Sequence, residues 1–166
     1  MKRLCLMRHA PAGAGDHAER STDDDPSLTP NGMTKARAAA WGLAELEIEA
    51  PVLPTSPFLR AVQKAEIVSQ VLGIPSDQIR RTDILKPGTS PSQLVEEILP
   101  LEAEAVVCAG HSPQLDDAIS HIPDCQSRIT RLKKAAVACL ELSSGSPPRG
   151  FLLWLYPPRM LRRLGR

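Results

Sequence analysis

Four side chains of the sequence have types that could do chemistry together, although they lie far apart along the chain. Arg8 and His9 end the first apolar run, and His111 follows shortly after a later one. Arg60 stands just after a turn that contains two prolines. Two imidazoles and two guanidinium groups make a positive set that is rich in hydrogen-bond donors and contains no carboxylate. The natural ligand of such a set is an anion with several oxygen atoms, most simply phosphate.

Each of these residues also has a simpler interpretation. A histidine at the end of a strand is usually structural, and an arginine at the start of a helix usually lies on the surface. Arg60 would stand in the first turn of its helix, where a cation is mildly unfavourable to the helix dipole. A bound anion would offset that cost. We favour the anion site because three separate strand-end segments show the same pattern.

The elements that would position these residues alternate between strands and helices. Apolar runs at 2–8, 52–53 and 103–109 predict strands, and segments with an apolar face at helical spacing follow them. We expect helices over 30–50, 58–72, 90–99 and from 113 onward, an edge strand over 80–85, and two paired strands over 135–142 and 151–156.

This alternation predicts an α/β fold: a three-layer αβα sandwich with a mostly parallel central sheet and one antiparallel strand near the C-terminus. We expect a single domain over residues 1–166. In open sheets of this kind, ligands bind outside the carboxyl ends of the strands. The four side chains are therefore expected to converge on one crevice.

Several residues mark the ends of the predicted helices. Thr29 can cap the first helix with Pro30 as its first residue, and Pro51 would end it. Gly73 is expected to end the second helix. A cluster of arginines follows residue 158, and its simplest interpretation is a solvated and partly frayed end of the chain. The alternative is docking to an acidic partner. The cluster comprises Arg159, Arg162, Arg163 and Arg166.

Composition and charge argue against several classes of function. A net charge of +1 creates no strong field toward nucleic acid or membrane, and an aromatic content of 3% argues against a base-stacking surface. No run approaches the roughly 18 apolar residues of a membrane span. The cysteines show no metal-binding spacing, and Cys5, Cys108 and Cys139 lie in apolar runs, as buried thiols do. We therefore expect a cytoplasmic protein with no metal.

The residues around these side chains resemble four motifs of a known family. Met7-Arg8-His9-Ala10, Leu28-Thr29-Pro30-Asn31-Gly32, Ser56-Pro57-Phe58-Leu59-Arg60-Ala61 with Gln63 and Glu66, and Gly110-His111 stand in the order found in the histidine phosphatase superfamily, which includes the phosphoglycerate mutases. The short chain, the full SPFLRA string and the final WLYPPRML look like the SixA branch, the protein phosphohistidine phosphatases. The chain departs from the family at Ala10, where glycine is common, and at Pro26, near which many members carry arginine.

The resemblance implies a mechanism and assigns roles to four residues. His9 would be the nucleophile and would pass through a phosphohistidine intermediate. Arg8, Arg60 and His111 would bind the phosphate and stabilise the transition state, a task that suits a protonated His111. The resemblance also implies that no metal or other cofactor is required.

The substrate expected from the resemblance is phosphohistidine on a partner protein, such as a histidine phosphotransfer domain or a phosphotransferase-system protein. Relatives that cleave other phosphate esters supply an acid from an inserted segment, and the stretch between Leu72 and Ser92 is too short for one. Asp16, Asp77 and Asp83 are conceivable acids without a supporting motif. An open site for a protein partner suits a monomer.

Three other interpretations compete with this one. A small-molecule phosphomonoesterase or mutase of the same superfamily would use the same residues, and a non-catalytic phosphate-binding module could be built on the same scaffold. A dinucleotide-binding domain is disfavoured, because Gly13-Ala14-Gly15 lies too far beyond the first strand and lacks the full glycine pattern.

Overall fold

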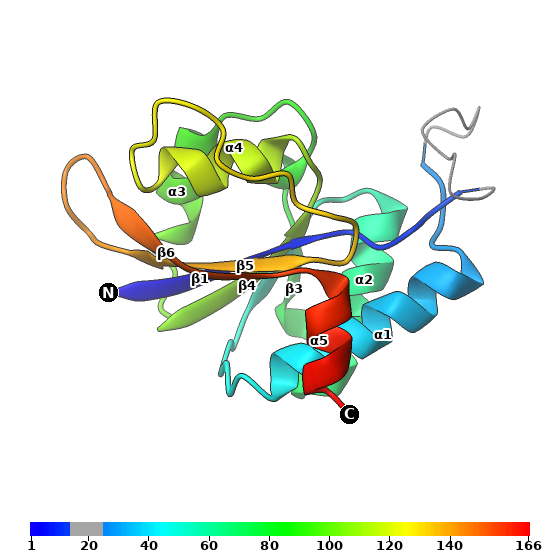
Figure 1. The fold of residues 1–166 in the computed structure, drawn as a ribbon. Coiled ribbons are helices and arrows are strands. Elements are labelled where there is room, and N and C mark those ends of the chain that lie inside the picture. The colour runs from blue at the N-terminus through cyan, green and yellow to red at the C-terminus, as the bar shows by residue number, and fades with distance from the viewer. Residues whose placement is uncertain (14–24) are drawn as a thin grey trace.

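The computed structural model describes residues 1–13 and 25–166, which form a sheet covered by helices on both faces (Figure 1). The sheet order is β3-β2-β4-β1-β5-β6. Parallel pairs join β1 to β4, β4 to β2, and β2 to β3, whereas β5 runs antiparallel to both of its neighbours. The predicted sheet, mostly parallel with one reversed strand near the C-terminus, is confirmed. The strands are Lys2–Arg8 (β1), Leu53–Thr55 (β2), Ile79–Arg81 (β3), Ala105–Gly110 (β4), Val137–Leu142 (β5) and Gly150–Tyr156 (β6).

Helices α1, α2 and α5 cover one face of the sheet, and α3 and α4 cover the other (Figure 1). Alternate side chains of β1 enter the two cores: Cys5 and Met7 pack on the side of α1 and α2, and Leu4 and Leu6 pack on the side of α3 and α4. The predicted three-layer αβα sandwich is confirmed. The helices are Pro30–Ala44 (α1), Leu59–Leu72 (α2), Pro91–Ile98 (α3), Gln114–His121 (α4) and Pro158–Leu164 (α5).

Local chemistry sets the helix ends. Thr29 caps α1, because its hydroxyl oxygen accepts a hydrogen bond from the Gly32 amide at 2.9 Å. Gly73 ends α2 in the left-handed conformation with φ of 68°. Both caps confirm the prediction. The expected end of α1 at Pro51 is wrong, since the helix stops at Ala44 and its last carbonyls are satisfied by a tight turn.

Two short elements differ from the prediction. The second strand, expected over 52–53, runs from Leu53 to Thr55 and pairs with β3 along its length. Pro54 is tolerated there because the pairing of β2 with β4 is confined to Thr55. The edge strand expected over 80–85 ends at Arg81. Residues 83–85 form a 3₁₀ turn instead, in which the Thr82 hydroxyl accepts a hydrogen bond from the Ile84 amide.

The C-terminus is folded, which corrects the expectation of a frayed end. Leu161 of α5 is buried against α1. Gly42 makes this contact possible, because a Cβ atom there would lie 2.1 Å from the carbonyl oxygen of Leu161. The arginines of the predicted cluster are exposed.

No helix in the described residues is long and apolar enough to cross a membrane. The three cysteines of the strands, Cys5, Cys108 and Cys139, are buried free thiols as expected, and Cys125 is an exposed one. Across 1–13 and 25–166, no cluster of histidine, cysteine or acidic side chains has the arrangement of a metal site.

Candidate active site

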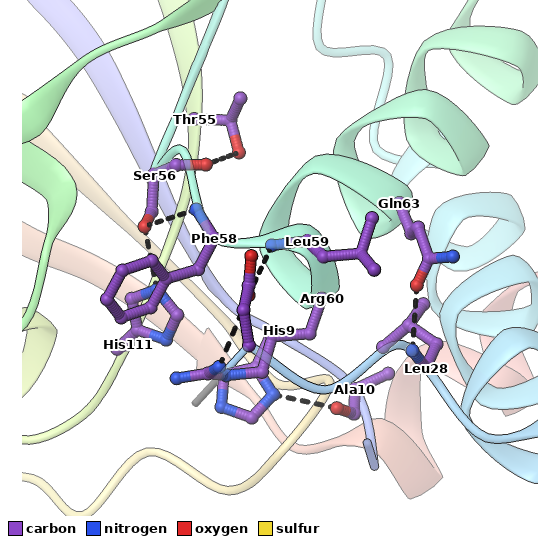
Figure 2. A network of polar contacts seen from close by, with 11 residues as sticks. His9, Ala10, Leu28, Thr55, Ser56, Phe58, Leu59, Arg60, Gln63 and His111 are labelled. Atoms are coloured by element: carbon purple, nitrogen blue, oxygen red, sulfur yellow. Dashed lines mark hydrogen bonds and ion pairs between the residues drawn. The ribbon is translucent and has the colours of Figure 1, made fainter. Parts of the chain in front are cut away.

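His9 and His111 lie side by side at the carboxyl edge of the sheet. β1 ends at Arg8 and β4 ends at Gly110, and these two residues are partners in the parallel register. The His9 amide donates to the Gly110 carbonyl at 3.0 Å, so the residues that follow the two strands stay adjacent. The imidazole centroids are 5.2 Å apart (Figure 2). Each ring is almost fully buried, with 8% of His9 and 2% of His111 exposed.

Arg60 reaches the same place from the start of α2. Its guanidinium carbon lies 5.0 Å from the centroid of the Phe58 ring, and the Phe58 ring in turn stands edge-on to His111 at 5.3 Å (Figure 2). Arg60 and Arg8 both act electrostatically on both imidazoles, lowering their pKa values. The four side chains selected from the sequence therefore converge at one point of the fold.

The hydrogen bonding of His9 determines which of its nitrogens carries the proton. Nδ1 lies 2.7 Å from the carbonyl oxygen of Ala10. Because a carbonyl oxygen can only accept a hydrogen bond, Nδ1 is the donor. In the neutral imidazole the lone pair then resides on Nε2. A buried, oriented imidazole with this lone pair available has the form that a nitrogen nucleophile needs.

Burial keeps both imidazoles uncharged. It lowers the pKa of His9 to about 3; the Ala10 carbonyl opposes this, and His111, Arg60 and Arg8 add to it. Burial, followed by the charges of Arg60 and Arg8, lowers the pKa of His111 to about 3. Both rings are therefore neutral at pH 7. Desolvation and two nearby cations therefore disfavour a further positive charge on His111 in this arrangement, and the protonated His111 expected with phosphate bound stays a prediction.

Ser56 orients His111. The Nε2 atom of His111 lies 2.8 Å from the Ser56 hydroxyl oxygen (Figure 2). The Phe58 amide donates a hydrogen bond to the same oxygen at 3.3 Å. Nδ1 of His111 is buried and has no hydrogen-bond partner within the described part of the chain. The SPFLRA string pointed to Ser56 only as part of a motif, and its partnership with His111 depends on the pairing of β2 with β4.

Arg8 is held at both its backbone and its side chain. One guanidinium nitrogen donates to the Leu132 carbonyl at 2.8 Å, and the Lys64 ammonium donates to the Arg8 carbonyl oxygen at 3.0 Å. Lys64 is fully buried, and burial lowers its pKa to about 7. Sequence reasoning missed this residue. The available signal was its position between Ala61 and Val68, on the apolar face of α2.

The structure places a carboxylate that was not predicted, that of Asp25, beside Arg60. Asp25 accepts a hydrogen bond from the Leu59 amide at 2.7 Å, and its carboxylate is 3.9 Å from the Arg60 guanidinium. Of the acids conceivable from the sequence, Asp77 is exposed in the turn before β3, and Asp83 pairs with Lys86 at 2.8 Å. Asp16 lies outside the described residues.

Comparison with known proteins places this arrangement in a family. Residues 4–136 match the model of the histidine phosphatase superfamily, branch 1. An uncharacterized protein from Picosynechococcus sp. is 31% identical over 147 residues, which are 86% of each chain.

Solved structures show the same fold at low sequence identity. The protein histidine phosphatase SixA complexed with tungstate has a TM-score of 0.82 at 23% identity, with 96% of this chain and 99% of that chain covered. A putative phosphohistidine phosphatase SixA from Agrobacterium tumefaciens has a TM-score of 0.75 at 20% identity over 95% and 98%. A mycobacterial glucosyl-3-phosphoglycerate phosphatase with inorganic phosphate has a TM-score of 0.73 at 15% identity over 96% and 99%. The family model, which matches most of the chain, shows that the chain belongs to the histidine phosphatase superfamily.

Proposed function

We propose that this chain is a phosphatase that removes phosphate from phosphohistidine on a partner protein, with His9 as the nucleophile. The observation that carries the proposal is the His9 side chain. Its Nδ1–H is fixed on the Ala10 carbonyl, which leaves the Nε2 lone pair available beside His111 and within reach of two arginine charges.

The proposed reaction has two transfers. The Nε2 lone pair of His9 forms a bond to phosphorus while the bond from phosphorus to the substrate nitrogen breaks. The substrate imidazole leaves as a neutral ring, because its other nitrogen already carries a proton. Water then attacks the phosphoryl group on His9 and releases inorganic phosphate, which restores the neutral ring. Arg8 and Arg60 would hold the phosphoryl oxygens, where their fixed charges stabilise the transition state.

The leaving group supports phosphohistidine as the substrate. An alkoxide needs a general acid when it departs, whereas an imidazole titrates near 6.5 and leaves easily with its own proton. Among the described residues, one carboxylate beside the site is that of Asp25, which is joined to the Leu59 amide and to Arg60. This arrangement suits a substrate whose leaving group needs little help. The SixA structures with the same fold, one named a protein histidine phosphatase, add support.

A second candidate is a small-molecule phosphomonoesterase. Its support is the equally extensive fold similarity to the mycobacterial glucosyl-3-phosphoglycerate phosphatase. The two candidates share the nucleophile and differ in the leaving group, so a comparison of substrates separates them.

The test uses a histidine phosphotransfer domain phosphorylated with phosphoramidate, and p-nitrophenyl phosphate as the small ester. We expect faster phosphate release from the phosphorylated domain and a phosphoenzyme that is stable in alkali and labile in acid. His9→Ala should abolish both. His121→Ala is the matched control, because His121 is an exposed histidine on α4. Release by His9→Ala at the parental rate would refute the nucleophile, and a preference for the ester would favour the second candidate.

A further inference from the structure

A basic groove adjoins the proposed active site. It is a cavity of roughly 580 Å³, and no carboxylate is among the described residues that line it. Its remaining walls are apolar, with three prolines and one alanine. The cationic side chains of the basic groove are those of Arg8, Lys35, Lys133, Lys134, Arg159 and Arg162.

Arg8 connects the groove to the histidine pair. The side chain lines the groove, and its charge lowers the pKa values of both His9 and His111. A substrate whose phosphoryl group lies at His9 would therefore extend past Arg8 toward the groove.

The other cations of the groove are contributed by two helices and one connecting segment. Lys35 belongs to α1, and Arg159 and Arg162 belong to α5, which packs side by side with α1 (Figure 1). Lys133 and Lys134 belong to the segment between α4 and β5. The groove is thus assembled by the tertiary fold from residues that are distant in sequence.

Buried hydrogen bonds hold the segment that carries the two lysines. A carboxylate oxygen of Asp116, 2% exposed, accepts from the Thr130 hydroxyl at 2.9 Å and from the Leu132 amide at 2.6 Å. The Arg8 guanidinium donates to the Leu132 carbonyl at 2.8 Å. Because the backbone just before Lys133 is anchored on both sides, the lysines are presented at a defined place beside Arg8.

Within the described part of the chain, the groove cations other than Arg8 form no ion pair. The ion pairs found among the described residues are Arg60 with Asp25, Lys86 with Asp83, Arg128 with Asp117, and Arg149 with Asp124. None of them involves the five groove cations other than Arg8. The whole chain carries a net charge of only +1, so this charge is a local feature rather than a general excess of lysine and arginine.

We propose that the basic groove binds acidic side chains that flank the phosphohistidine of the partner protein, which rests on the function proposed above. The phosphoryl group itself would be held at Arg8 and Arg60, which leaves the remaining cations for a second, separate set of negative charges. An acidic segment supplies such a set, because its carboxylates are spaced along the peptide. The groove cations are likewise spaced apart, over α1, α5 and the segment before β5. Complementary charges of this kind select a partner and speed its association.

Two synthetic peptides test the proposal. Each has one histidine phosphorylated with phosphoramidate; aspartate and glutamate flank it in one peptide, and asparagine and glutamine in the other. The groove variant is Lys133→Gln/Arg159→Gln. The control is Arg3→Gln/Arg80→Gln, which removes the same charge from exposed residues that do not line the groove. The readouts are kcat/KM for each peptide and fluorescence anisotropy with the unphosphorylated peptides.

We expect the parent protein to prefer the acidic peptide by about five- to tenfold in kcat/KM, a size typical of a few exposed charge pairs. The groove variant should lose this preference and hydrolyse the neutral peptide within about twofold of the parent, whereas the control should keep it. An unchanged preference in the groove variant would overturn the proposal, as would an equal loss in the control.

The anisotropy measurement separates this proposal from the proposed function. If neither phosphorylated peptide is hydrolysed, the proposed function fails, yet binding of the unphosphorylated acidic peptide to the parent and not to the groove variant still supports the groove. If the acidic peptide does not bind while inorganic tripolyphosphate does, the groove accepts a small polyanion and the docking of an acidic segment is refuted.

Discussion

Lys64 provides a direct test of how the site is built, because its side chain is fully buried behind the strand that carries Arg8 and His9. The proposed change is Lys64→Met, which keeps the length of the side chain and removes the charge. In the folded protein the pKa of Lys64 is about 7 against 10.5 in an unfolded chain, and burial is the cause. The folded state therefore holds this proton less tightly than the unfolded state.

The magnitude follows from this difference in pKa. At about 1.4 kcal/mol per pKa unit, burying the charged form of Lys64 costs on the order of 5 kcal/mol below pH 7. The substitution removes that cost, but it leaves the Arg8 carbonyl without this donor, which costs about 1–3 kcal/mol. We therefore expect Lys64→Met to be more stable than the parent by about 2–4 kcal/mol at pH 6.

The pH dependence gives the prediction its sign. Between pH 7 and 10.5 the unfolded parent binds more protons than the folded parent, so the stability of the parent rises with pH over this window. The variant lacks this contribution. Its advantage should therefore shrink by about 3 kcal/mol between pH 6 and pH 9.5.

Urea unfolding of both proteins at pH 6 and pH 9.5 measures the change, and comparison of the two proteins cancels the groups that they share. Lys64→Gln is the matched variant, since it keeps an N–H donor without the charge. Hydrolysis of the phosphorylated domain should fall by about tenfold to a hundredfold in Lys64→Met, because the peptide group between Arg8 and His9 loses its fixed partner. A stability difference that stays constant from pH 6 to pH 9.5 would refute the reasoning.

Three further predictions follow from the geometry. Because burial lowers the pKa values of His9 and His111 to about 3, the protein should lose stability as pH falls from 6.5 toward 3, where the unfolded chain binds more protons. Urea unfolding across this range checks it, and flat stability would contradict it. Ser56→Ala removes the 2.8 Å hydrogen bond to His111 and should cost about 1–3 kcal/mol of stability. An unaltered unfolding midpoint would show that this hydrogen bond contributes nothing. Gly42→Ala places a Cβ atom against the Leu161 carbonyl and should lower stability by at least about 1–3 kcal/mol. A thermal midpoint equal to that of the parent would refute the close approach of α5 to α1.

The part of the site that lies at strand ends could be predicted from the sequence. An apolar run that stops at Arg8, and another that stops before His111, locate both residues at the carboxyl edge of a parallel sheet. The motif around Arg60 adds the third segment. These predictions need only local patterns and the topology rule, so they do not depend on the details of packing.

The supporting residues depend on contacts between distant parts of the chain. Lysine is a residue type usually found at the surface. Lys64 is buried because its ammonium group donates a hydrogen bond to the Arg8 carbonyl oxygen at the end of β1. The docking of α5 depends on Leu161 meeting Gly42, about 120 residues earlier. Neither pairing leaves a periodic pattern in the sequence. The lowered pKa of His111 could not be predicted for a related reason, because it depends on burial that only the assembled core provides.

The charges around the histidine pair suggest that binding of the phosphoryl group would promote protonation of His111 in the proposed reaction. The pKa of His111 is low because burial and two guanidinium groups oppose a third positive charge. A phosphoryl group held between Arg8 and Arg60 would offset those charges, and an adjacent anion raises the pKa of an imidazole. His111 could then gain the proton that the sequence led us to expect from the start. His9, with Nδ1 fixed on a carbonyl, would use its Nε2 lone pair for phosphorus instead. Burial, with a smaller contribution from these cations, would thus keep the nucleophile unprotonated before the substrate arrives, and the same cations would neutralise the substrate once it is bound.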